Sequence, residues 1–118
     1  GGLAAAHAVN DGFAQEPQAH GMYHGEKVAF GTLVQLVLEK APQEELEQVL
    51  AFLRDTGLPL TLAQLGVKEI VPETLKKVAE AAVVPTQSTK NLRADITAQE
   101  VYDAILEADR IGRDYLAR

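Results

Sequence analysis

Apolar side chains recur three and four residues apart along most of this chain, and that spacing constrains the fold more than any other feature. Between residues 43 and 56 the apolar positions trace one face of a helix: Leu46, Val49, Leu50 and Leu53. No stretch has the convincing period-two alternation that indicates a half-buried strand. The sequence therefore predicts an all-α fold without a nucleotide-binding sheet.

Helix start and stop signals place the other predicted elements around this segment. On the N-terminal side, the sequence predicts an alanine-rich helix from Leu3 to about Phe13, a polar connection from Ala14 to Tyr23 and a largely buried helix from Glu26 to Lys40. On the C-terminal side, it predicts a short helical turn from Thr61 to Leu65, a helix from Pro72 that ends before Pro85 and a polar loop from Thr86 to Asp95. A capping box of Thr97 and Glu100 then starts a last helix from Ala98 to Ala117.

The composition narrows the classes of protein to which the chain can belong. With 118 residues, 47% hydrophobic and 24% charged, residues 1–118 are expected to form one soluble globular domain. A net charge of -6 and scattered Lys and Arg residues argue against nucleic-acid binding. The most apolar stretch, Val28 to Leu38, is too short to cross a bilayer, which needs about 20 apolar residues. A membrane partner is therefore not expected.

The absence of cysteine excludes a disulfide framework and a thiolate metal site, and it fits a cytoplasmic protein without a signal peptide. Any metal must use nitrogen and oxygen ligands. All three histidines lie in the first 24 residues, which favours an imidazole site. His20 and His24 have the spacing of one helical face, but Gly21 and Gly25 lie next to them. We interpret this segment as a loop that enters a helix rather than a helix that carries both ligands.

A second arrangement joins His7 and Asp11 on the first helix, with His24 arriving from the next element. The competing interpretation is that Asp11, followed by Gly12, only marks the frayed end of that helix. His24 itself stands at the start of a buried helix, where the helix dipole disfavours positive charge and keeps the imidazole neutral. Neutral imidazole is the form that binds a metal.

Two segments that contain histidine carry a resemblance to a known family. They read Gly1-Gly2-Leu3-Ala4-Ala5-Ala6-His7-Ala8 and Tyr23-His24-Gly25-Glu26-Lys27-Val28-Ala29-Phe30-Gly31-Thr32, and the likeness continues through Leu36-Val37-Leu38-Glu39, Thr56-Gly57-Leu58-Pro59, Leu62-Ala63-Gln64-Leu65 and Val101-Tyr102-Asp103-Ala104-Ile105-Leu106. These segments resemble the glycerol dehydrogenases of the iron-containing alcohol dehydrogenase superfamily. The segment Ser88-Thr89-Lys90-Asn91 departs from the family pattern, in which a histidine tends to precede the asparagine.

The resemblance implies that residues 1–118 are the helical, metal-binding C-terminal domain of a dehydroquinate synthase-like fold. In that family the histidine of each segment binds zinc, which assigns His7 and His24 as metal ligands and names no further catalytic residue. The third ligand is an aspartate of an N-terminal dinucleotide-binding domain that this chain lacks, and Asp11 is not its counterpart. The chain begins without methionine, so we expect it to be cut from a longer protein.

The implied reaction is the oxidation of glycerol to dihydroxyacetone, with hydride transfer to NAD. One zinc per subunit acts as a Lewis acid that lowers the pKa of the substrate hydroxyl. NAD is bound mainly by the missing domain. The expected partners are therefore a polyol substrate, the chain's own N-terminal domain and further copies in a homo-oligomer. The isolated chain is expected to be inactive.

Two other functions remain open at this level. A different alcohol or polyol dehydrogenase of the same superfamily, acting on a phosphorylated or aldehyde substrate, would share the fold and both histidines. A phosphate needs convergent cations, and apart from Lys27, which stays open, none stands near His7 or His24. A non-catalytic helical assembly module is the alternative from another class, but such a module does not need both histidine segments.

Overall fold

The structure is a computed structural model that describes residues 9–22, 24–83 and 96–118 of the chain. These residues form helices joined by turns, and no strand occurs among them. After a helical stretch at residues 9–12, the elements follow in the order η1 (Phe13–Gln15), η2 (Pro17–Ala19), α2 (His24–Leu38), α3 (Gln43–Thr56), α4 (Pro72–Ala82) and α5 (Ala98–Leu116), where η marks a 3-10 helix. The all-α prediction is confirmed.

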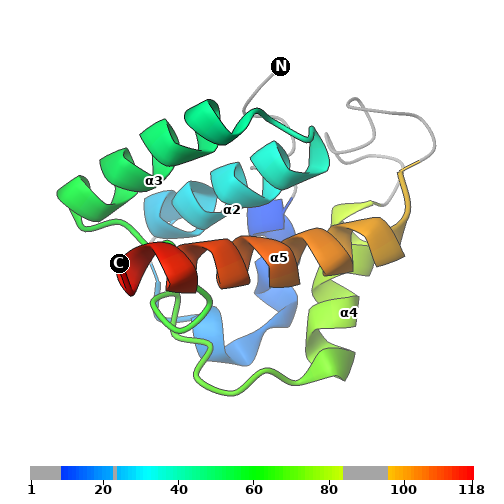
Figure 1. The fold of residues 1–118 in the computed structure, drawn as a ribbon. Helices are drawn as coiled ribbons and strands as arrows, with labels where there is room; N and C mark the ends of the chain where they lie inside the picture. Colours follow the sequence, from blue (N-terminus) through cyan, green and yellow to red (C-terminus); the bar gives the residue numbers. More distant parts are fainter. Residues whose placement is uncertain (1–8, 23, 84–95) are drawn as a thin grey trace.

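Helix α2 is the central element of the fold. Its middle is buried on nearly every side, because Phe30, Leu33 and Val34 are fully enclosed and Gln35 is also buried. Such a helix must be covered all round. Helix α3 lies on one side of it and α5 on another, and all three run roughly along one direction (Figure 1).

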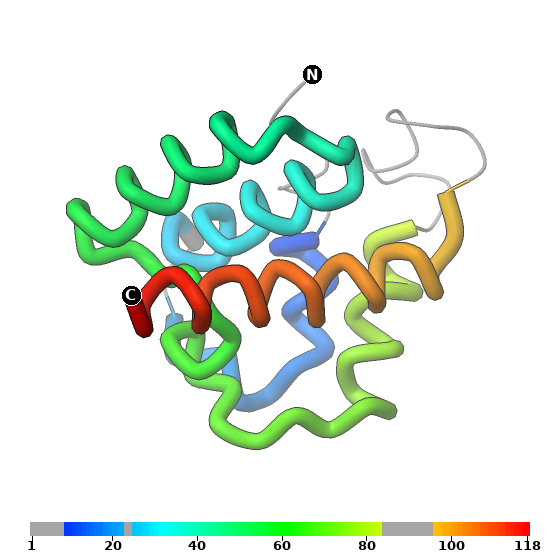
Figure 2. Tube along the Cα trace, in the orientation of Figure 1, coloured from blue at the N-terminus to red at the C-terminus, as the bar shows by residue number. Residues whose placement is uncertain are grey.

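Helix α5 joins the two halves of the molecule. It packs on α2 and on α4, and α4 crosses it steeply, as the tube trace also shows (Figure 2). Its start is fixed by a capping box: Thr97 Oγ1 accepts from the Glu100 N–H at 3.2 Å, and Glu100 Oε1 accepts from the Thr97 N–H at 3.2 Å. The predicted capping box is therefore confirmed.

The C-terminal end of α5 is held against α3. Arg118 makes a two-pronged ion pair with Glu47, at 2.8 Å and 2.9 Å, and its guanidinium lies 5.1 Å from the centroid of the Tyr115 ring. Arg54 of α3 lies 5.2 Å from the same ring. The hydrogen bonds from Arg118 and Gln43 hold the pKa of Glu47 below its usual value.

The irregular segment 57–71 runs beneath α5 and is anchored to it. Asp109, 3% exposed, accepts a hydrogen bond from the Leu62 N–H at 2.8 Å through Oδ1 and one from Arg113 Nε at 3.0 Å through Oδ2. One turn later, Gly112 packs directly on the carbonyl of Leu60, with no room for a Cβ atom. A small residue and a buried carboxylate thus attach this segment to the helix.

Several predicted boundaries hold and others shift. Helix α3 has the predicted bounds and ends at Gly57, whose φ of 76° is left-handed. Helix α2 ends at Leu38 rather than Lys40, because Lys40 itself takes a left-handed φ of 56°. Residues 61–65, predicted as a short turn of helix, form a non-helical turn that ends at Gly66. Helix α5 ends one residue earlier than predicted.

The polar connection predicted from Ala14 to Tyr23 is more ordered than expected, since it contains part of η1 and all of η2 and buries both Glu16 and Ala19. The start of the first predicted helix and the loop predicted at 86–95 lie outside the described residues. Within the described ranges, no helix has both the length and the hydropathy needed to traverse a bilayer.

Substitution of Gly112 by Ala is expected to lower the free energy of unfolding by about 1–3 kcal/mol, because the added methyl group meets the Leu60 carbonyl and forces α5 away from the segment below it. Thermal denaturation followed by circular dichroism measures the loss. Gly21→Ala is the control, since a Cβ at Gly21 meets nothing within 4 Å. Equal melting temperatures for the two variants would contradict the proposed contact.

Replacing Asp109 by Ala should also destabilise the fold, by about 1–3 kcal/mol, because the Leu62 N–H loses its acceptor in a buried place. Urea denaturation measures the change. The matched variant Asp103→Ala removes an exposed carboxylate from the same helix and should shift stability by less than about 0.5 kcal/mol. A loss of the same size in both variants would show that the Leu62 hydrogen bond contributes nothing specific.

Candidate metal centre

His24 is the first residue of α2. Its backbone belongs to the described part of the structure, and its side chain does not. Residues 20–22 are not helical, because His20 and Gly21 lie in a turn and Met22 in a bend. His20 and His24 therefore do not share a helical face. The interpretation of this segment as a loop that enters a helix is confirmed.

His20 is exposed and makes a local contact. Its ring Nε2 lies 3.0 Å from the backbone oxygen of Ala14, which fits an imidazole that donates its Nε2 hydrogen to that carbonyl. The contact joins the middle residue of η1 to the turn after η2. It gives His20 a structural role in this connection and leaves only Nδ1 as a free acceptor.

His7 lies outside the described residues, which begin two positions later with a helical stretch at residues 9–12. This stretch is firmly packed. Gly12 lies against α4, where a Cβ would come 2.5 Å from the Val78 carbonyl oxygen. The next residue, Phe13, meets Phe30 of α2 edge to face, with ring centroids 6.2 Å apart. The helix end that follows His7 is thus fixed relative to the helix that begins with His24.

Asp11 points to solvent in the structure. It is exposed, and its Oδ1 accepts a long hydrogen bond of 3.4 Å from the neighbouring Asn10 amide. No group of three His, Asp or Glu side chains suited to a metal occurs within the described ranges. The described carboxylates thus do not complete a site of their own, while the arrangement of His7, Asp11 and His24 stays a prediction.

The connection between the two histidine segments is held by two residues that sequence reasoning missed. Glu16 is 1% exposed, and its Oε1 accepts from the Gln18 N–H at 3.0 Å, which caps η2. The Gln18 side chain forms hydrogen bonds with the segment before α4. Its Oε1 accepts from the Lys68 and Glu69 N–H groups at 3.0 Å and 3.1 Å, and its Nε2 donates to the Glu69 carbonyl at 2.8 Å.

Only Glu16 left any signal in the sequence. An acceptor side chain immediately before a proline is a helix-start pattern. The partners of Gln18 are about fifty residues away, and no local pattern indicates them. Both residues fix the path of the chain from the first helix to His24.

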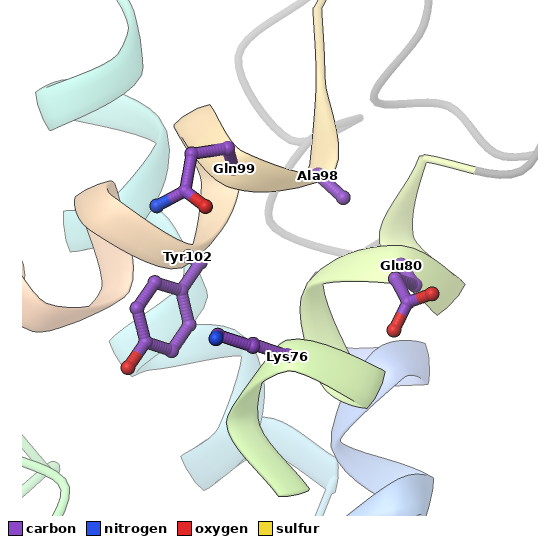
Figure 3. Close-up of a pocket in the computed structure, with 5 residues that line it drawn as sticks. All are labelled: Lys76, Glu80, Ala98, Gln99 and Tyr102. Carbon is purple, nitrogen blue, oxygen red and sulfur yellow. The ribbon is translucent and has the colours of Figure 1, made fainter. Parts of the chain in front are cut away.

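A pocket of about 240 Å³ lies between α4 and α5 and is lined by Lys76, Glu80, Ala98, Gln99 and Tyr102 (Figure 3). The Lys76 ammonium stands 5.7 Å from the centroid of the Tyr102 ring, and Glu80 projects from the same helix as Lys76. These lining residues include one carboxylate and no histidine, so they do not form a metal site of the kind expected at His7 and His24.

Comparison with known proteins relates the chain to one group of enzymes, although no model of a protein family matches it. It is 54% identical over 116 residues to a glycerol dehydrogenase of Escherichia coli O6:H1. Among solved structures, glycerol dehydrogenase from Schizosaccharomyces pombe superposes with a TM-score of 0.90 at 39% identity over 98% of the chain. A probable glycerol dehydrogenase from Sinorhizobium meliloti 1021 gives a TM-score of 0.88 at 43% identity over 94% of the chain.

The chain spans about a third of the length of these relatives. Its match covers 32% of the Escherichia coli protein, and 30% and 32% of the Schizosaccharomyces and Sinorhizobium chains. Identity and superposition nevertheless extend over almost all of the 118 residues, and the matching region is helical throughout its described parts apart from turns. By sequence and by fold alike, the chain is homologous to one helical third of the glycerol dehydrogenases.

Proposed function

We propose that this chain is the C-terminal part of a zinc-dependent, NAD-linked glycerol dehydrogenase and supplies His7 and His24 to its metal site. The observation that carries the proposal is the 54% identity to the Escherichia coli glycerol dehydrogenase. That match spans 98% of the chain and so includes the positions of both histidines. The proposed activity is the oxidation of glycerol to dihydroxyacetone, and it belongs to the longer protein rather than to the chain alone.

The donor set of the chain fits zinc in kind but is incomplete. Imidazole nitrogen is a preferred zinc ligand, and catalytic zinc sites use three protein ligands. The chain offers two, and Asp11 lies exposed with its carboxylate engaged by Asn10. The third ligand is proposed to be an aspartate from the dinucleotide-binding domain, which this chain does not contain. A zinc ion held there would act as a Lewis acid on the substrate hydroxyl.

The role of this chain is then to position its two imidazoles and keep them neutral. The contact of Phe13 with Phe30 and the close approach of Gly12 to Val78 fix the segment after His7 against α2 and α4. His24 begins a helix of 15 residues, whose N-terminal dipole favours the uncharged ring. Rigid placement of metal ligands by packed helices is a general requirement for such sites.

An alternative is an oxidoreductase of the same superfamily with another polyol, alcohol or aldehyde substrate. It would use the same two histidines and differ in the groups around the substrate. A helical module without catalysis is a further alternative, in which neither histidine would matter. Proposed further partners are other copies of the protein in a homo-oligomer, and the proposed location is the cytoplasm.

The activity is expected to appear when the chain replaces the homologous third of the Escherichia coli glycerol dehydrogenase. With zinc, NAD and glycerol present, the increase in NADH absorbance measures the rate. His7→Ala and His24→Ala should each lower kcat/KM at least about a hundredfold, since outer-shell partners of a metal alone are worth roughly ten- to hundredfold.

His20→Ala is the matched control, because that ring contacts the Ala14 carbonyl and is not assigned to the metal. Full activity in His7→Ala or His24→Ala would refute the ligand assignment. Oxidation of another alcohol in preference to glycerol would keep the metal site and change the substrate. No activity with any alcohol would favour the assembly module.

The isolated chain should bind zinc only weakly, because it provides two imidazoles without a third ligand. Calorimetric titration at neutral pH tests this, and binding should weaken further below about pH 6.5 as the imidazoles become protonated. Asp11→Asn is expected to leave the affinity unchanged. Tight, stoichiometric binding that Asp11→Asn abolishes would instead establish a local site of His7, Asp11 and His24.

A further inference from the structure

A groove of about 310 Å³ lies between α2 and α3 and is almost entirely apolar. Val28, Ala29 and Thr32 line it from α2, and Val49, Phe52 and Leu53 line it from α3. The Thr32 hydroxyl donates to the Val28 carbonyl at 3.0 Å, so it is satisfied within its own helix. None of the residues that line the groove is charged. The groove therefore offers little to a polar ligand such as a polyol or an anion.

Phe52 lies at the rim of this groove and is 52% exposed, more than any other large apolar side chain in the described part of the chain. The half-exposed ring and the apolar lining of the groove together form a continuous apolar surface, and such surfaces are typical of sites that contact another protein segment. Phe52 belongs to α3, which has a defined C-cap at Gly57 and buries its opposite face in the core through Leu46, Leu50 and Leu53. Its exposure therefore follows from the regular geometry of a packed helix.

Gly25, in the first turn of α2, also lines the groove. A Cβ placed there meets no described atom within 4 Å, and its φ is not left-handed. Since glycine has no side chain, another backbone can approach α2 closely at this position.

We propose that the α2–α3 groove is the surface on which the rest of the longer polypeptide packs, through an apolar segment that covers Phe52 and approaches Gly25. Relatives of this chain carry about two thirds of their length outside the matching region, so a large partner surface is available within the same protein. The proposal rests on the homology to those relatives and not on the zinc assignment. A second copy of the chain is the competing occupant.

The test uses the absence of cysteine from the chain, which makes a single introduced thiol a specific probe. Phe52→Cys is prepared in the 118-residue chain and in the chimera with the Escherichia coli protein. Maleimide labelling is followed by mass spectrometry of the peptide that contains residue 52. The thiol should react readily in the isolated chain and at least about tenfold more slowly in the chimera, because a packed segment must open before the reagent enters.

Lys77→Cys is the control, since Lys77 is exposed on α4, which does not line the groove. Its labelling rate should be the same in both proteins. Equal rates for Phe52→Cys in chain and chimera would overturn the proposal. Protection in the isolated chain that increases with protein concentration would also overturn it, in favour of a second copy.

Gly25→Leu provides a measurement that does not depend on labelling. In the isolated chain it should leave the melting temperature unchanged or slightly raised, because a Cβ at this position meets no described atom within 4 Å and leucine favours a helix more than glycine does. In the chimera the same substitution should lower the melting temperature, because the side chain meets the docked segment. Tolerance in both proteins would contradict the proposal. Protection of residue 52 in a chimera without dehydrogenase activity would support the docking surface and count against the proposed activity alone, since neither test needs zinc or NAD.

Discussion

The burial of α2 is the constraint on which the remaining structure depends. A helix whose middle is apolar on nearly every side cannot face water, so α3, α5 and the end of the first helix must surround it. The edge-to-face contact between Phe13 and Phe30 is part of this covering and also fixes the segment that follows His7. The same burial that stabilises the core therefore fixes the helix end at residues 9–13 relative to α2, which begins at His24.

Regular elements were predictable because their signals are local. The capping box of Thr97 and Glu100, the αL glycine at position 57 and the apolar face of α3 each lie within a few residues of the boundary they specify. The end of α2 was missed by two residues, because a left-handed Lys40 has no reliable sequence signature. Lysine rarely adopts that conformation, and only the turn into α3 explains it.

Long-range polar contacts could not be predicted in the same way. The spacing of apolar residues along α5 does not show whether Asp109 is exposed or buried. Its burial is explained by its hydrogen bonds from the distant Leu62 N–H and from Arg113. Gln18 likewise depends on backbone groups of residues 68 and 69. For the site, the sequence predicted the loop before His24 and disfavoured a helical pair with His20, and the resemblance supplied the ligand assignment. The metal itself stays a prediction.

The segment 57–71 has little regular structure, yet three separate devices attach it to the core: the Asp109 carboxylate, the close approach at Gly112 and the side chain of Gln18. Irregular connections usually accept insertions, because their backbone groups are satisfied by water. Here the backbone amides of residues 62, 68 and 69 are all bonded to side chains from other elements. An insertion or deletion would break several of these hydrogen bonds at once. This connection therefore holds α3 and α4 at a fixed distance and is expected to tolerate changes in length poorly.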